Sequence, residues 1–369
     1  MDTPKKISEI QTAAVVISSI IGVGVLPLPL FAVKAGNTAA PIVTLIGITI
    51  SLFALLIITK LGMTHPTKTI IGYSEEILGK WLARFCNIIV ILFFALLTGL
   101  GAREFGAVVI TAILRETPIE VTVIVMLLLA AITSRNDLNI FAYIHTFYLP
   151  VILSPVVIIV VLSLKNANFL YLQPLLGGDM GDMFKGSLTI AALCQWSFVL
   201  TIIIPSMLQP KRAMKACTAG LLIAGVILFM LVVASLAVFG AEETKKLLWP
   251  TLELARTTSL PGNILQRLDV VFLAVWVTAV FTTLFSGYTF TCYALTGIFR
   301  LSDHKIFSFS LLPIIFLFSM LPGNLLQMYK TIEVVGRMGL ILTIVYPCLL
   351  LVIDVIRRKR GKRSAAAKT

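Results

Sequence analysis

Long apolar stretches recur along the whole chain, and they restrict its fold more than any other feature. A helix needs about 20 mostly apolar residues to cross the roughly 30 Å hydrocarbon core of a bilayer. Hydrophobic residues make up 58% of the 369 residues and charged residues only 13%, too few to cover a soluble surface. We therefore predict a single all-α membrane domain over residues 1–369, with a first span too long to be a cleavable signal. Its ten transmembrane helices are expected near 10–34, 38–60, 82–113, 117–133, 140–164, 187–209, 216–239, 269–299, 306–321 and 332–356.

Basic residues are distributed unevenly between the loops, and this asymmetry predicts the orientation. The net charge is +13, and 19 of the 30 basic residues fall on one side if the N-terminus is cytoplasmic. Seven of them lie in the C-terminal segment RRKRGKRSAAAK. The positive-inside rule then places both termini in the cytoplasm, with 357–369 as a basic cytoplasmic tail. Attraction of this tail to anionic lipid is an alternative explanation of its charge.

The segment SSIIGVGVLPLPLF (18–31) interrupts the first predicted span with two glycines and two prolines. In hydrocarbon, unwound backbone is tolerated only if a polar partner satisfies its N–H and C=O groups. Glycine permits close approach, whereas Pro27 and Pro29 remove donors and interrupt the helix. A half-helix that starts there would direct free amides near Gly24 and Val25 at a carboxylate. The pattern therefore predicts a ligand site, with a proline kink between packed helices as the alternative.

Two further similarities link the two halves of the chain. LCQWSF (193–198) puts polar side chains in the middle of the sixth span, five spans after the first interruption. Spans 3 and 8 are both unusually long, about 32 residues, which implies tilt. This layout predicts a five-plus-five inverted repeat with broken helices 1 and 6, the repeats covering about 8–164 and 186–356. Gln195, Trp196 and Ser197 either line a pocket or bond between helices.

Span 3 contains LTGLGAREFGA, in which two charged residues, Arg103 and Glu104, follow two glycines. Charges inside a membrane are expensive and normally face a partner or a watery cavity. Adjacent residues point about 100° apart on a helix, so we expect each to have its own partner. They form either an outer gate over the pocket or a structural clamp. The candidate partners are Lys34, Lys330, Glu333 and Arg337.

Span 8 and the loops carry further polar groups. Thr282, Thr283 and Ser286 either line a pocket or bond carbonyl groups of their own helix. The inner loop 64–84 is predicted to form an amphipathic helix along the membrane. The outer loops 165–186 and 240–268 are the largest, and the second is expected to hold short helices that rest on the outer face.

Enzyme and metal signatures are missing from the sequence. The three histidines, His65, His145 and His304, are expected at loop edges, and GYSEEILGKW lacks the first glycine and the hydroxyl of a phosphate loop. The cysteines are not spaced as zinc ligands or placed for disulfides, so we predict packing roles. We expect no catalytic residue, no metal, no cofactor and no nucleic-acid partner. The cysteines are Cys86, Cys194, Cys217, Cys292 and Cys348.

Three features together resemble a known family: ten spans, the Gly-x-Gly break followed by prolines, and the inner-loop stretch YSEEILGKWLAR. The chain resembles the B subunit of bacterial spore germinant receptors, within the amino acid–polyamine–organocation transporter superfamily. An acidic residue often precedes the tyrosine in that family, whereas this chain has Gly72 before Tyr73. The resemblance covers essentially the whole chain.

This resemblance implies a leucine-transporter-type fold and a germinant pocket between helices 1, 3, 6 and 8. It also implies A and C partner subunits in the spore inner membrane. The implied ligand-binding residues are Gly22, Val23, Gly24, Val25, Gly99, Leu100, Gly101, Ala102, Cys194, Gln195, Trp196, Ser197, Phe198, Thr282, Thr283 and Ser286.

Two functions follow from the sequence, a ligand-sensing receptor subunit and an ion-coupled amino-acid transporter. Proton coupling would be expected to leave a titratable residue near the pocket. We expect none at mid-membrane in spans 1, 5, 6 and 8, because Lys34 and His145 fall towards span ends and Asp269 lies at the mouth of span 8. A sodium site could still form from carbonyls near Gly22 and the span 8 hydroxyls. The absence therefore favours sensing without deciding it.

Overall fold

The structure is a computed structural model that describes residues 6–174, 178–258 and 268–366, and its regular elements there are helical. An isolated bridge between Ile7 and Met207 is the exception within these ranges. Two short 3-10 segments, η1 (Val23–Val25) and η5 (Gln195–Val199), interrupt the helices. The helices are α1 (Glu9–Ile20), α2 (Leu28–Gly36), α3 (Ala40–Thr64), α4 (Ile70–Leu78), α5 (Lys80–Ala112), α6 (Ile119–Thr133), α7 (Leu138–Ser163), α8 (Met180–Leu193), α9 (Leu200–Ile203), α10 (Ala213–Thr244), α11 (Pro250–Thr257), α12 (Leu268–Phe299), α13 (Lys305–Ser310), α14 (Leu312–Met320), α15 (Leu325–Leu340) and α16 (Tyr346–Ala366).

Among the described residues, six helices are long and apolar enough to cross a membrane, and a bent pair makes a seventh. The bent pair joins Met180–Leu193 to Gln195–Ser206 at 42°, within predicted span 6. Shorter apolar helices, Glu9–Ile20, Ile119–Thr133 and Lys305–Met320, lie in predicted spans 1, 4 and 9. Each of the ten predicted stretches therefore contains a helix, and the chain is an all-helical membrane protein with six or seven candidate spans.

Local sequence signals explain where several helices begin and end. Ser8 caps α1 through a reciprocal pair of hydrogen bonds with Gln11, at 2.9 and 3.2 Å. Asn37, with φ 50°, ends α2 and lets the chain turn into α3. Gly79, with φ 89°, separates α4 from α5, because few residues other than glycine adopt that angle without strain. The predicted amphipathic helix over 64–84 is therefore shorter, since the backbone breaks at Gly79.

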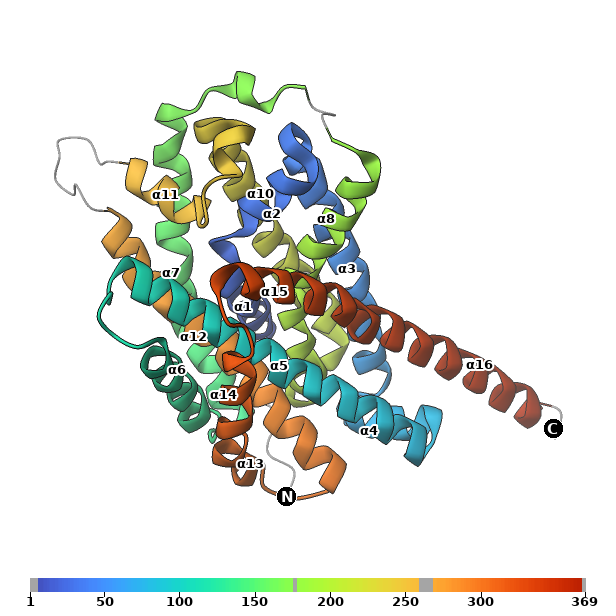
Figure 1. Cartoon of the computed structure of the whole chain (residues 1–369). Coiled ribbons are helices and arrows are strands. Elements are labelled where there is room, and N and C mark those ends of the chain that lie inside the picture. The colour runs from blue at the N-terminus through green and yellow to red at the C-terminus, as the bar shows by residue number, and fades with distance from the viewer. Residues whose placement is uncertain (1–5, 175–177, 259–267, 367–369) are drawn as a thin grey trace.

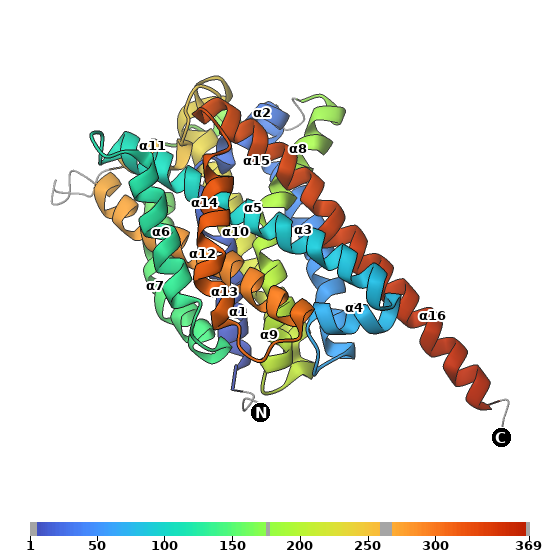
Figure 2. The ribbon, with the colours of Figure 1, turned by 60° about the horizontal axis from the view of Figure 1, so that its bottom comes forward.

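Figures 1 and 2 show the helices arranged as a bundle with α1 inside it. α1 packs against α7, α10 and α12, and α2 packs against α3, α8 and α10. α5 crosses α12 and α14, and α15 packs against both α5 and α8. Both termini lie towards the end of the bundle opposite α11, and α16 projects away from it (Figures 1 and 2). The interrupted segments are thus surrounded by other helices rather than placed at the periphery.

Several predicted lengths are confirmed and others are corrected. α5 has 33 residues and α12 has 32, as expected for spans 3 and 8. α10 also runs for 32 residues, but Gly240 (φ 73°) kinks it just beyond the predicted end of span 7. α16 continues as a helix from the predicted last span into the predicted tail, as far as Ala366. A short helix in the loop 240–268 is confirmed: α11 buries Thr251, Leu252, Leu254 and Ala255 and packs against α2, α7, α10 and α12.

Candidate functional site

The first predicted span is interrupted where the glycines and prolines occur. α1 ends at Ile20, η1 forms a single turn, and α2 begins at Leu28. A Cβ atom on Gly22 would lie 1.8 Å from Thr283 Oγ1 and 2.8 Å from the Ala279 carbonyl oxygen. Only glycine therefore allows the interrupted backbone to approach α12 so closely.

The carbonyl groups around this interruption accept hydrogen bonds from other helices. Thr282 Oγ1 donates to Ser18 O at 3.0 Å, and Thr283 Oγ1 donates to Ser19 O at 3.1 Å. Trp276 Nε1 donates to Gly22 O at 3.1 Å. These bonds remove the penalty for unpaired carbonyls in an apolar environment. The span 8 hydroxyls thus act on the backbone of α1, as well as on their own helix.

A buried cluster of serine and histidine side chains completes this side of the interruption. Ser19 Oγ lies 2.7 Å from Ser286 Oγ, which lies 3.2 Å from His145 Nε2. His145 Nδ1 lies 2.5 Å from Ser18 Oγ, and the His145 side chain is fully buried. The expectation that His145 sits at a loop edge is therefore wrong, because the side chain points from α7 into the bundle. His145 lies on the same face of α7 as Phe141 and Ala142, which are buried. This spacing of three and four residues was visible in the sequence and indicates a buried histidine.

The second interruption lies between α8 and η5, as the polar stretch in span 6 predicted. Gln195 Nε2 donates to the Gly336 carbonyl at 2.6 Å, and Ser197 Oγ donates to the Cys194 carbonyl at 2.8 Å. Both side chains therefore bond to protein backbone. The Trp196 ring packs between α5 and α12, where a Cβ on Gly287 would lie 2.6 Å from it.

A narrow cavity of about 30 Å³ opens where the two interruptions meet α5. We call it the break cavity. Apart from Glu104 and Thr189, its side chains are apolar, and it includes five predicted site residues, Val23, Gly24, Leu100, Gly101 and Trp196. The cavity has further lining residues on α2, α5, α8 and α15 that the sequence analysis did not name as ligand-binding, and α15 belongs to predicted span 10. These residues are Phe31, Leu97, Thr189, Ala192, Leu193, Ile332 and Gly336.

The other predicted site residues lie elsewhere. Gly22 and Val25 line a small hollow beside Trp276 on the opposite side of the interruption. A Cβ on Gly99 would lie 2.7 Å from the Ile315 carbonyl oxygen. The lack of a side chain at Gly99 therefore lets α5 pack closely against α14. Ala102 is buried without lining the break cavity. A separate hollow beside α3 and α15 is lined by Cys194, Gln195, Ser197 and Phe198.

The two charged residues of span 3 point in different directions, as their spacing predicted. Arg103 donates to Met320 Sδ and to the Pro322 carbonyl, both at 3.2 Å. Glu104 is 3% exposed, lines the break cavity and has the Tyr329 hydroxyl within hydrogen-bonding reach. The expected charged partners are thus corrected: Glu333 pairs with Arg337 on its own helix.

α11 closes the end of the bundle above the break cavity. Trp249 Nε1 donates to the Tyr329 hydroxyl at 2.7 Å, and Thr251 Oγ1 donates to the Val25 carbonyl at 2.8 Å. Beside it, a vestibule shares Phe31 with the break cavity and carries charged side chains. These are Lys34, Asp182, Lys185, Lys330, Glu333 and Arg337.

Solved structures with the same architecture are membrane transporters. The chain matches the nucleobase–cation symporter Mhp1 with a TM-score of 0.64 at 14% identity, over 92% of this chain and 78% of that one. It matches a Na⁺-coupled sialic acid symporter with a TM-score of 0.67 at 11% identity, over the same shares. These likenesses define the fold class, the leucine-transporter-type membrane fold.

The sequence comparisons define the family within that class. The family described as "Spore germination protein" matches residues 6–328, so the chain belongs to it. It is 28% identical to spore germination protein YndE of Bacillus subtilis over 97% of this chain and 98% of the relative. It is 25% identical to spore germination protein A2 of the same organism, over 97% and 98%. The resemblance to B-type germinant receptor subunits is confirmed along nearly the full length.

Proposed function

We propose that this chain is the nutrient-sensing membrane subunit of a spore germinant receptor, and that a small germinant binds in the break cavity. The observation that carries the proposal is the meeting of both interrupted helices at one largely apolar cavity. Irregular backbone inside a membrane is tolerated where it lines a cavity, and transporter folds bind substrates there. The germinant would be an amino acid or a similar small molecule, and Gly101 and Trp196 would form its walls.

The backbone amides of the interruption would hold a carboxylate or an equivalent polar group. Among the described residues, the amides of Val23 and Gly24 have no acceptor from another element, and both residues line the cavity. The Val25 amide makes a long bond of 3.4 Å to Gly22 O. We therefore propose that the carboxylate contacts the amides of Val23 and Gly24, rather than those of Gly24 and Val25 as the sequence analysis expected. The positive end of the α2 dipole would add to the attraction.

Sensing requires only that the ligand prefers one arrangement of the interrupted helices. A preference of about 5.5 kcal/mol shifts a two-state equilibrium almost completely. The shift would pass to A and C partner subunits, which would then trigger germination. α11 offers a path, because it bonds both to Val25 and, through Trp249, to Tyr329 beside the cavity.

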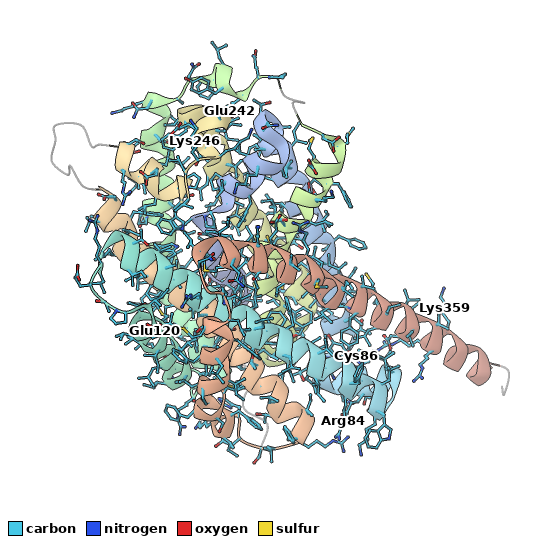
Figure 3. All side chains as sticks on the ribbon, in the orientation of Figure 1. Arg84, Cys86, Glu120, Glu242, Lys246 and Lys359 are labelled. Atoms are coloured by element: carbon cyan, nitrogen blue, oxygen red, sulfur yellow. The ribbon has the colours of Figure 1, made fainter. Side chains whose placement is uncertain are left out.

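We further propose ten spans in a five-plus-five inverted repeat, with both termini cytoplasmic and the protein in the spore inner membrane. The paired interruptions and the paired long helices α5 and α12 support the repeat. Figure 3 shows Glu242 and Lys246 at the end near α11, and Arg84 and Lys359 towards the other end. Cysteines introduced at Lys246 and Lys359 should label from opposite sides of the membrane. Labelling of both from the outside would contradict this orientation.

An ion-coupled amino-acid transporter is the second candidate, and His145 favours it. This titratable side chain is buried against Ser18, just before the interruption, so a main argument against proton coupling does not hold. Uptake of labelled alanine into vesicles that contain the protein, with and without sodium and pH gradients, separates the two functions. Gradient-driven accumulation well above the bound stoichiometry would establish transport, and saturable binding without accumulation is expected for a sensor.

Replacement of Gly24 by leucine tests the site itself. A Cβ there would already lie 2.7 Å from Leu193 Cδ2, so a leucine side chain would fill the cavity. We expect spores with Gly24→Leu to lose the germinant response while the protein still inserts. Gly72→Leu is the matched control, because the nearest atom to its Cβ is the Lys68 side chain at 3.4 Å. A normal response from inserted Gly24→Leu protein would refute the site.

A further inference from the structure

The separate hollow beside α3 and α15, which we call the span 6 hollow, has a lining rich in oxygen atoms. It encloses about 10 Å³, just enough for one water-sized group. Four residues with side-chain oxygens line it, and they come from three parts of the fold. These are Ser51 of α3, Gln195 and Ser197 of η5, and Thr343 of a π-helical turn over Ile341–Val345. Such turns occur frequently at functional sites.

The three hydroxyl groups of this lining have already donated their hydrogen atoms. Ser51, Ser197 and Thr343 each donate to a backbone carbonyl three or four residues earlier, at 2.9, 2.8 and 3.0 Å. A hydroxyl group has one hydrogen atom and two acceptor lone pairs. These side chains therefore offer only acceptor lone pairs to a group in the hollow.

The amide group of Gln195 adds a fourth acceptor. Its Nε2 donates to the Gly336 carbonyl at 2.6 Å, which fixes the orientation of the amide. Its Oε1 is buried and has no hydrogen-bond partner within the described part of the chain. A Cβ on Gly339 would lie 2.5 Å from this oxygen, and the Gly339 carbonyl is the one to which Thr343 donates. The unsatisfied oxygen of Gln195 thus lies at the same turn of span 10 as the Thr343 hydroxyl.

The rest of the lining adds no strong donor and no charged side chain. Its other polar side chain, the Cys194 thiol, is a weak donor and has Ser51 within hydrogen-bonding reach. α8 ends at Leu193, and Ala191 and Cys194 line the hollow, so the negative end of the α8 dipole lies beside it. The span 6 hollow is therefore a buried cluster of acceptors in a field that favours positive charge.

We propose that the span 6 hollow binds one alkali cation, Na⁺ or K⁺. Neutral protein oxygens can replace the hydration shell of such an ion, whereas Ca²⁺ prefers sites with carboxylate ligands. A water molecule has two hydrogen atoms and could donate to only two of the four oxygens. The site is not the sodium site expected near Gly22, whose carbonyl accepts a hydrogen bond from Trp276. It goes beyond the proposed function, because it does not depend on where the germinant binds.

The cation would hold three parts of the membrane domain together. Its ligands lie on α3, on the second interruption and on the turn that joins α15 to α16. A ligand that binds only the folded protein raises the free energy of unfolding as its concentration increases. Bound cation should therefore raise the unfolding temperature in a saturable way.

Binding of radioactive Na⁺ and of radioactive Rb⁺, which replaces K⁺, to purified protein in nanodiscs tests the site. Choline chloride keeps the ionic strength constant, since its cation is too large for the hollow. Thr343→Val and Ser51→Ala each remove one acceptor oxygen, on different helices. Thr44→Val is the matched control, because its buried hydroxyl also donates to a carbonyl of its own helix, at 2.9 Å, but does not line the hollow. Thr282→Val tests the alternative site near Gly22.

We expect wild type to bind one alkali ion per protein and to unfold at a higher temperature in its presence than in choline. Thr343→Val and Ser51→Ala should each weaken ion binding by roughly 10- to 100-fold, because each loses a polar contact to a charged group. Thr44→Val should bind the ion as wild type does. If Thr343→Val does not fold, Ser51→Ala decides.

Four results would overturn the inference. Absence of saturable Na⁺ and Rb⁺ binding to wild type would mean that the hollow holds a water molecule at most. Unchanged affinity in folded Thr343→Val and Ser51→Ala would place the ion elsewhere. Loss of binding in Thr282→Val alone would place it near Gly22. Displacement of the bound ion by Ca²⁺ at lower concentration than by unlabelled Na⁺ or K⁺ would contradict an alkali-ion site.

Discussion

The two sides of the interruption in the first span differ in how their polar groups are satisfied. One side, the sealed face, consists of Ser18, Ser19, His145, Thr282, Thr283 and Ser286. Its hydroxyl, imidazole and carbonyl groups bond to one another. The other side, the open face, consists of Val23, Gly24 and Glu104. These three residues line the break cavity, and within the described part of the chain the amides of Val23 and Gly24 and Glu104 Oε1 have no hydrogen-bond partner from another element.

This difference teaches that unwinding a membrane helix does not by itself create a binding site. The same seven-residue gap between α1 and α2 has one side closed by protein groups and one side available to a ligand. Substitutions on the sealed face should therefore change stability, and substitutions on the open face should change ligand response. Three predictions concern the interruption and its cap, and a fourth concerns a site far from it.

The largest effect is expected for Gly22→Ala on the sealed face. Its methyl group would overlap Thr283 Oγ1 and approach the Ala279 backbone, which cannot rotate away. Overpacking of this kind costs about 3 kcal/mol or more in the free energy of unfolding. Gly24→Ala is the matched control, because its methyl group meets only the movable end of Leu193. Equal thermal stability of the two purified variants would show that the sealed face and the open face tolerate an added methyl group equally well.

His145→Ala is expected to have the second largest effect. It removes the partner of both Ser18 and Ser286 and leaves a void, at a cost of about 2 to 3 kcal/mol. Ligand selectivity should stay as in wild type. A double-mutant cycle with Ser18→Ala should give a coupling energy of about 1 kcal/mol. Additive effects would mean that the two side chains do not form one unit.

Thr251→Val should have a smaller effect, where α11 caps the interruption. It keeps the shape of the side chain but leaves the buried Val25 carbonyl without its 2.8 Å hydrogen bond. We expect a loss of about 1 to 2 kcal/mol in unfolding free energy. Because α11 bonds to both the interruption and Tyr329, the germinant response should also change. Thr257→Val, at an exposed residue whose hydroxyl bonds only its own helix, is the control.

The smallest effect is expected for Glu75→Gln, far from the interruption at the end of the bundle that holds both termini. Its hydrogen bond from Arg84, aided by Arg300, holds the pKa of the carboxyl group below its ordinary value despite burial. A lowered pKa stabilises the fold above the ordinary value, and this contribution is lost as pH falls through the folded-state value. We expect less than about 1 kcal/mol at neutral pH. Melting curves of wild type and variant should converge in acid, and constant separation would contradict this origin.

Much of the helical framework could be predicted from local sequence. The apolar stretches placed a helix in every predicted span, and the glycine–proline and polar motifs located both interruptions. Gly79 is a typical turn residue, but the predicted inner-loop helix over 64–84 runs through it and is therefore too long. Five of the 16 predicted ligand-site residues line the break cavity. Span 10 was not part of the predicted site, because Ile332 and Gly336 carry no polar signal.

The sequence by itself determined that this chain is a bundle of membrane helices with two interruptions. Hydrocarbon requires long apolar segments, and it disfavours the glycines, prolines and polar residues that mark where two of those segments are interrupted. Only the tertiary structure decided which groups each interruption meets. His145 and Ser18 are 127 residues apart, and Gln195 and Gly336 are 141 apart. Such contacts depend on how each helix is rotated and where it crosses its neighbours. Helical periodicity fixes which residues share a face, but packing alone selects the neighbour that the face meets.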